Sequence, residues 1–163
     1  MVDRRASLEL SLRAARLDIE LITKYVDLAE IHAWCDALLE STDGLPFAIY
    51  DLATEPKVEV AHGHLMSIAE EHGLRRVYER AWVSFAKDLA ASLEASKLDA
   101  TDAIWRLDRI EDWCMPLPKK VAAFKSSSAD DPNLWQLWNL EASPEELKGA
   151  LVRWLAQWAD PPR

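Results

Sequence analysis

The longest regular apolar stripe of the chain lies in residues 74–95, LRRVYERAWVSFAKDLAASLEA. Its apolar side chains recur every three or four positions, which is the spacing of one face of an α-helix. The members of the stripe are Leu74, Val77, Tyr78, Ala81, Trp82, Phe85, Leu89 and Leu93. The segment therefore predicts a long amphipathic helix, which we expect at the centre of a helical bundle.

The residues before this segment predict four further helices, at about 4–25, 28–40, 46–52 and 57–72. Asp27 and Glu30 have the spacing of a capping box, in which each side chain satisfies a backbone amide at the start of a helix. Gly44 and Gly73 follow the second and fourth of these helices, where glycine tolerates the left-handed backbone that ends a helix.

The C-terminal part of the chain predicts shorter helices. Asp99 and Thr101 are candidate caps for a helix that carries apolar residues up to Cys114 and is closed by prolines 116 and 118. A short helix at 119–125, a loop at 126–132 and a helical turn with Trp135 and Trp138 follow. Ser143-Pro144-Glu145-Glu146 is a strong helix start, and we expect the tail at 161–163 to be frayed.

Composition agrees with an all-α class. The 163 residues include only four glycines, and half of the residues are apolar while 29% are charged, which excludes disorder. There is no repeat and no shift in composition. We therefore predict one all-α domain over residues 1–163, an irregular bundle of about six or seven helices. No apolar run approaches the ~20 residues of a membrane span, and no signal peptide precedes the first helix, so we expect a cytoplasmic protein.

Residues 18–59 hold most of the charge imbalance of the chain. They contain ten acidic residues and two lysines, a net charge of −8 against −9 for all 163 residues. Such a concentration favours encounter with a basic protein, although a solvated face that only aids solubility explains it as well. The candidate partner-binding residues are Asp36, Glu40, Asp43, Asp51 and Glu55. Self-association stays open as well.

Metal, cofactor and catalytic sites are not predicted. His62 and His64 are two positions apart and would point to different sides of a helix, which indicates a solvated histidine-containing helix. His32 and Cys35 share a face, but two ligands alone do not make a metal site. No glycine-rich phosphate loop or nucleophile elbow is present, so we expect a protein that is not an enzyme, although paired-carboxylate hydrolysis stays open. A pI near 4.9 argues against nucleic acid as a partner, because the basic clusters at 75–80 and 119–125 are short.

Eight tryptophans are unusual for a chain of this length. Most fall on predicted core stripes, and we expect the exceptions to be Trp135, Trp138 and Trp158. An alternative function is therefore a small-molecule-binding or catalytic domain whose pocket is lined by Trp34, Trp82 and Trp105. Cys35 and Cys114 lie in apolar patterns and are predicted to be buried free thiols in a reducing compartment.

Part of the acidic segment resembles a known group of proteins. The residues are Leu21-Ile22-Thr23, Ile31, Trp34, Asp36, Leu38-Leu39, Ile49, Asp51 and Leu52. Their pattern is similar to that of small all-helical bacterial proteins, some of which look like immunity proteins of contact-dependent or polymorphic toxin systems. The resemblance implies an antitoxin-like inhibitor that covers a basic site on a toxin domain, typically a nuclease.

Overall fold

The computed structural model describes residues 4–127, 132–139 and 141–159, and these residues form helices and connections without any β-strand, which confirms the all-α class. The chain divides into two compact units, unit 1 from Met1 to Ala81 and unit 2 from Trp82 to Arg163. The boundary falls within one long helix, α5. That both units form one domain remains a prediction. No helix of the described residues has the length and apolar character that a membrane span needs.

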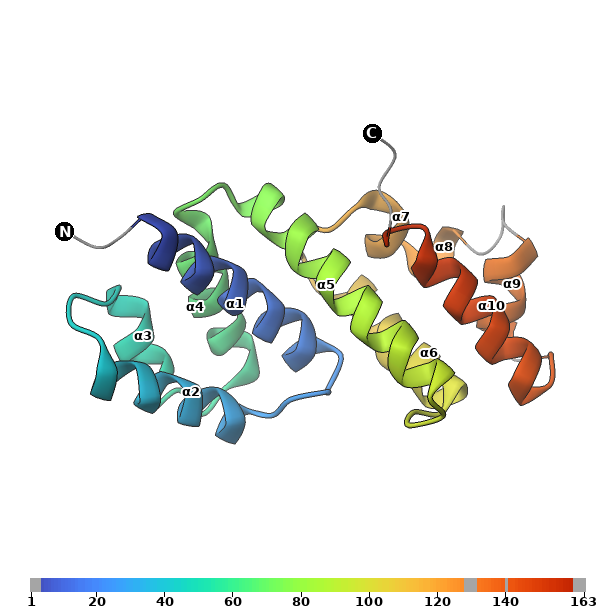
Figure 1. Cartoon of the computed structure of the whole chain (residues 1–163), viewed down its shortest axis with the longest axis horizontal. Coiled ribbons are helices and arrows are strands. Elements are labelled where there is room, and N and C mark those ends of the chain that lie inside the picture. Colours follow the sequence, from blue (N-terminus) through green and yellow to red (C-terminus); the bar gives the residue numbers. More distant parts are fainter. Residues whose placement is uncertain (1–3, 128–131, 140, 160–163) are drawn as a thin grey trace. The chain divides into compact units, whose positions relative to one another are not determined.

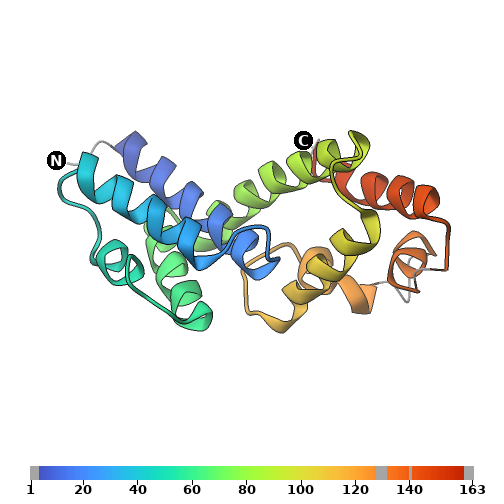
Figure 2. The same ribbon diagram turned by 90° about the horizontal axis from the view of Figure 1, so that it is seen from below.

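Unit 1 contains α1 (Arg4–Ile22), α2 (Leu28–Ser41), α3 (Phe47–Leu52), α4 (Val58–Glu70) and the first part of α5 (Leu74–Glu94). The helix α1 packs against α4, α4 against α3, and α3 against α2 (Figures 1 and 2). Their apolar faces meet in a core of buried residues, among them Leu17, Leu21, Ile31, Ile49, Leu52 and Leu65. The second half of α1 is almost completely buried, so this helix is the centre of the unit.

The helix boundaries of unit 1 follow the predicted caps. Asp27 and Glu30 form the capping box, with both backbone-to-side-chain hydrogen bonds at 2.9 Å. Gly44 and Gly73 have φ angles of 72° and 84°, as their turns require. The first helix ends at Ile22 instead of the predicted Tyr25, because Lys24 has a φ of 58° and the chain leaves the helix there.

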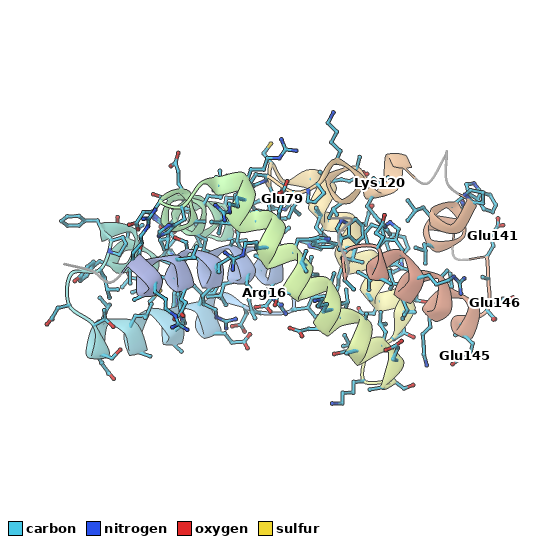
Figure 3. The ribbon with its side chains drawn as sticks, turned by 45° about the horizontal axis from the view of Figure 1, so that its top comes forward. Arg16, Glu79, Lys120, Glu141, Glu145 and Glu146 are labelled. Atoms are coloured by element: carbon cyan, nitrogen blue, oxygen red, sulfur yellow. The ribbon has the colours of Figure 1, made fainter. Side chains whose placement is uncertain are left out.

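Unit 2 contains the rest of α5 and a set of shorter helices: α6 (Ala100–Asp108), the 3-10 helix η1 (Arg109–Asp112), α7 (Lys119–Ala122), α8 (Phe124–Ser127), α9 (Pro132–Asn139) and α10 (Pro144–Ala156). The helix α10 packs against α6 and α9. An aromatic cluster fills the unit, in which the ring of Trp82 lies 6.2 Å from Trp154 and 5.4 Å from Trp158. The predicted start of α10 is confirmed, with a capping box between Ser143 and Glu146. Figure 3 labels Glu145 and Glu146 in the first turn of this helix.

The structure of unit 2 differs from the sequence predictions at three places. The sequence pattern predicts that Cys114 is buried on a helix, but α6 ends at Asp108 and Cys114 follows the 3-10 helix in an exposed connection. The sequence predicts Trp158 as an exception to core packing, but it is half-buried against Trp82 and Trp154. The predicted loop at 126–132 is shorter, since α8 includes residues 126 and 127 and α9 begins at Pro132; residues 128–131 and the tail at 161–163 lie outside the described part.

Candidate functional site

A pocket of about 550 Å³ opens on unit 1 between the start of α1, the helix α2 and the α2–α3 connection. Its apolar wall contains Leu10, Trp34, Leu38, Leu45 and Phe47. Three exposed acidic residues, Glu9, Asp43 and Glu71, and one base, Arg13, also border it. We call this site the acid-rimmed pocket. Its volume lies in the range of about 300–1,000 Å³ that is usual for ligand sites.

The sequence explains how this pocket forms. Trp34 and Leu38 are four residues apart on α2 and therefore share one face of that helix. After α2, the left-handed backbone at Gly44 turns the chain so that Leu45 and Phe47 complete the wall. Ser7, on the α1 side, is held by a 2.8 Å hydrogen bond with Nε2 of His72. The pocket is thus built from three segments that are distant in the sequence.

Exposed aromatic side chains lie beside the pocket on α3. The side chain of Phe47 is 87% exposed and that of Tyr50 is 50% exposed, with ring centroids 6.3 Å apart. Exposed aromatic groups next to an apolar pocket are typical of surfaces that bind other molecules, because they lose water-exposed apolar area when a partner covers them.

The five predicted partner-binding acids are distributed over this part of unit 1. Asp36 and Glu40 are exposed on α2, Asp43 lies in the α2–α3 connection and Asp51 is exposed on α3. Glu55 is half-buried after α3, and its carboxylate accepts the backbone N–H of Lys57 at 2.9 Å. A helix turns by about 200° over two residues, so Asp36 lies on a different side of α2 from Trp34 and Leu38. Of the five acids, the structure brings Asp43 to the pocket.

Two acids of the pocket, Glu9 and Glu71, are not among the predicted residues. Glu9 belongs to the first helix and Glu71 follows α4, so both lie outside the acidic segment 18–59. Their position depends on how α1 and the end of α4 meet the α2–α3 connection, and no local signal in the sequence shows this.

The three tryptophans of the predicted ligand pocket have different environments. Trp34 lines the acid-rimmed pocket, whose wall includes neither of the other two. Trp82 is fully buried in the aromatic cluster of unit 2, and Trp105 is 52% exposed on α6. Of the three tryptophans predicted to line one pocket, Trp34 therefore lines this pocket and the other two do not.

A buried polar cluster connects three helices of unit 1. Asp18 on α1 has no exposed surface, and its carboxylate accepts hydrogen bonds from the Tyr78 hydroxyl at 2.5 Å and from Nδ1 of His62 at 2.8 and 2.9 Å. His62 lies on α4 and Tyr78 on α5. Since Asp18 bonds to residues of both other helices, the cluster links the packing of α1, α4 and α5.

Burial shifts the pKa values of Asp18 and Tyr78 in this cluster. It raises the pKa of the Asp18 carboxyl above its usual 3.8, while the bonds from His62 and Tyr78 act in the opposite direction. Burial and the nearby Asp18 raise the pKa of Tyr78, so its hydroxyl remains a donor. The prediction of a solvated helix is wrong for His62, which is half-buried, because the sequence does not reveal the buried acid that it meets.

His32 and Cys35 also have structural environments. Nε2 of His32 donates to the carbonyl oxygen of Glu55 at 2.9 Å, and Cys35 is buried, as predicted. Burial and the neighbouring Asp36 raise the pKa of the Cys35 thiol to about 11. Among the described residues, no group of three or more His, Cys, Asp or Glu side chains could hold a metal ion.

Comparison with protein-family models, curated proteins and solved structures gives no match for this chain. The resemblance to immunity proteins therefore remains a prediction, and functional inference depends on the site itself.

Proposed function

We propose that unit 1 is a protein-binding module that captures a basic partner at the acid-rimmed pocket. The observation that carries the proposal is the combination of an apolar cavity of about 550 Å³ with three exposed acids at its border. The occupant we propose is a surface segment of a folded protein that presents an apolar or aromatic side chain flanked by lysine or arginine.

The apolar wall supplies the binding free energy in this proposal. Trp34 and Leu38 offer a concave surface, and the 87% exposed ring of Phe47 lies beside it. A side chain that enters the cavity would remove apolar area on both molecules from water, at about 25 cal/mol per Å². Tryptophan and a few neighbours commonly dominate such interfaces.

The charges supply selectivity. Glu9 at the pocket is paired with Arg5 at 3.2 Å, and Arg13 is paired with Glu20 at 3.8 Å. The negative charge of the pocket, −2, therefore comes from Asp43 and Glu71. Exposed charges contribute less to affinity than to the rate of encounter and to the rejection of acidic partners. Asp36, Glu40 and Asp51, which are exposed on α2 and α3, would extend the same negative field around the site.

The more specific form of the proposal is an immunity-type inhibitor of a toxin domain, acting in the cytoplasm. The resemblance in residues 21–52 and the net charge of −8 in residues 18–59 support this form. The free thiols Cys35 and Cys114 suit a reducing compartment.

A selection from a random peptide display library against the whole chain tests the binding proposal. We expect enriched peptides to combine lysine or arginine with an aromatic residue. Reversing two pocket acids, Asp43→Lys with Glu71→Lys, should weaken the binding of a selected peptide by at least about tenfold, or 1.4 kcal/mol. A matched control reverses two exposed acids of unit 2, Glu94→Lys with Glu141→Lys, and should leave affinity unchanged at equal ionic strength.

Enrichment of acidic peptides, or equal loss of affinity in the pocket and control variants, would contradict the proposal. Reversal of Asp36 and Glu40 should mainly slow association and change its salt dependence, since these residues lie on another side of α2. The inhibitor form needs a separate test, in which the product of the adjacent reading frame is expressed with this chain. Rescue of growth by the wild type but not by the Asp43 and Glu71 variant would support it.

The volume of the pocket also favours a second candidate, the binding of a small amphipathic cation. A thermal-shift screen of organic amines against matched neutral compounds tests it, because a ligand of the folded state raises the melting temperature. A cation that stabilises the wild type but not Trp34→Ala would favour this function over a protein partner.

A further inference from the structure

A second pocket on unit 1, of about 220 Å³, has an unusual set of charges. Its wall contains Arg4 and Leu8 of α1, and His72, Arg76, Val77 and Arg80 at and beyond the start of α5. Three of these six residues are arginines and one is histidine, whereas the chain as a whole has a net charge of −9. We call it the arginine pocket.

The arginines of this pocket differ from those nearby. Arg5, Arg16 and Arg75 each form an ion pair with a glutamate four residues on, at 3.2, 2.7 and 3.1 Å (Figure 3 labels Arg16 and Glu79). No such pair within 4.0 Å joins Arg4, Arg76 or Arg80 to a carboxylate of the described chain. The carboxylates of the described chain therefore do not neutralise the positive charge of Arg4, Arg76 and Arg80.

The spacing of the basic residues gathers their charges. Arg76 and Arg80 are four residues apart on α5 and therefore share one side of that helix. His72 lies before α5, where the left-handed backbone at Gly73 turns the chain, and it lines the same pocket. Arg4 faces them from α1. Like charges at this spacing repel one another, and an anion between them would remove that repulsion.

His72 has a defined role in this geometry. Its Nε2 is engaged with the hydroxyl of Ser7, a residue that is almost fully buried, at 2.8 Å. This bond fixes the imidazole ring in the wall and leaves Nδ1 as the ring nitrogen for a ligand. The helix α5 also begins here, at Leu74, and the positive end of its dipole adds to the field of the arginines.

We propose that the arginine pocket binds the phosphate group of a small phosphorylated molecule. A tetrahedral anion with two charges can accept hydrogen bonds from several guanidinium groups at once, whereas a monocarboxylate is satisfied by one. A volume of about 220 Å³ admits a phosphate or pyrophosphate group, and the rest of a larger ligand would extend into solvent. A long polyanion is disfavoured because the remainder of the chain is acidic.

Titration of the whole chain with sodium pyrophosphate, followed by calorimetry and by the arginine Nε–H resonances in NMR, tests the proposal. Sodium acetate and sodium chloride at matched ionic strength are the controls. We expect saturable binding of pyrophosphate that acetate does not reproduce, with shifts at Arg4, Arg76 and Arg80. Equal affinity for pyrophosphate and a nucleoside diphosphate would assign the free anion as the source, and tighter binding of the latter would assign a nucleotide; both support the site.

Three single variants locate the site. Arg76→Gln on α5 and Arg4→Gln on α1 should each weaken pyrophosphate binding by about tenfold, because each removes one guanidinium group from a different wall of the pocket. The matched control is Arg75→Gln, which removes the same charge from a neighbour that does not line the pocket. Since all three side chains are exposed, circular dichroism should show unchanged folding.

Absence of saturation at millimolar pyrophosphate would overturn the proposal. Equal weakening by Arg75→Gln would also overturn it, since binding would then follow net charge alone. Capture by vesicles that contain phosphatidic acid, without binding of pyrophosphate, would assign the arginines to a membrane surface instead and equally refute it. None of these outcomes depends on the acid-rimmed pocket, so the two proposals are tested independently.

Discussion

Replacement of Asp18 by alanine should destabilise unit 1 strongly. The carboxylate has no exposed surface and is the acceptor for both the Tyr78 hydroxyl and Nδ1 of His62. An unsatisfied buried polar group costs about 1–3 kcal/mol, and loss of the carboxyl group leaves two donors without their acceptor. We expect a total of about 3 kcal/mol, because the side chain of His62 is 13% exposed and retains some contact with water.

Two conservative variants separate the contributions of the individual hydrogen bonds to the stability lost in Asp18→Ala. Tyr78→Phe removes one hydrogen bond to the carboxylate and should cost about 1.5–3 kcal/mol. Asp18→Asn keeps the shape of the side chain and an oxygen that can accept from Tyr78, so its cost should be the smallest of the three. The expected order of destabilisation is therefore Asp18→Ala, then Tyr78→Phe, then Asp18→Asn.

Urea denaturation at pH 7, followed by far-UV circular dichroism, gives the free energies of unfolding. Hydrogen exchange with mass spectrometry then locates the effect, since peptides from residues 4–81 should lose protection. If Asp18→Ala lowers the free energy of unfolding by less than about 1 kcal/mol, the reasoning is refuted. A typical domain has only about 5–15 kcal/mol of stability, so the loss of a buried acceptor should be a measurable part of it.

The pH dependence of stability, the reactivity of the two cysteines and the cap of α10 can each be tested. Burial raises the Asp18 pKa above 3.8, so the carboxyl group binds its proton more tightly in the folded protein than in the unfolded chain. This difference contributes to the free energy of unfolding in full below pH 3.8, and the contribution is lost as the pH rises through the raised pKa. The difference in unfolding free energy between wild type and Asp18→Asn should therefore fall on raising the pH, and a difference independent of pH would contradict this. Exposed Cys114 should react with iodoacetamide well before buried Cys35, whose pKa is about 11, as followed by mass spectrometry; equal rates in the folded protein would count against the assignment. Ser143→Ala removes the cap of α10 and should cost about 1 kcal/mol in urea denaturation, whereas Ser143→Gly should cost only a few tenths; identical losses would argue against the cap.

The helices of this protein are largely predictable from the sequence, because their signals are local. The stripe at 74–93 predicts a buried face on α5, and the structure confirms it at every member except Leu74, which is half-buried. The capping residues Asp27 and Ser143 need only the backbone three residues on, so their roles follow from spacing alone. Errors occur where a pattern continues past a helix end, as it does near Cys114.

The sites are much less predictable, because they depend on tertiary contacts. Asp18 counts as one acid among ten in the sequence, but in the structure it is buried beneath His62 and Tyr78. Flanking by Leu17 and Ile19 was the available signal, although acids between apolar residues also occur on helix surfaces. Glu71 reaches the acid-rimmed pocket only because α1 and α4 pack together.

The buried Asp18 cluster also has a consequence for the order in which unit 1 folds. The hydrogen bond from Tyr78 to Asp18 closes a loop of 60 residues, and that from His62 closes one of 44. Closing such loops costs chain entropy before any contact is gained, so these bonds should form after the local helices and their caps. In stopped-flow measurements, Tyr78→Phe should therefore speed unfolding and change the refolding rate little. The cluster would then form late in folding and slow the unfolding of unit 1.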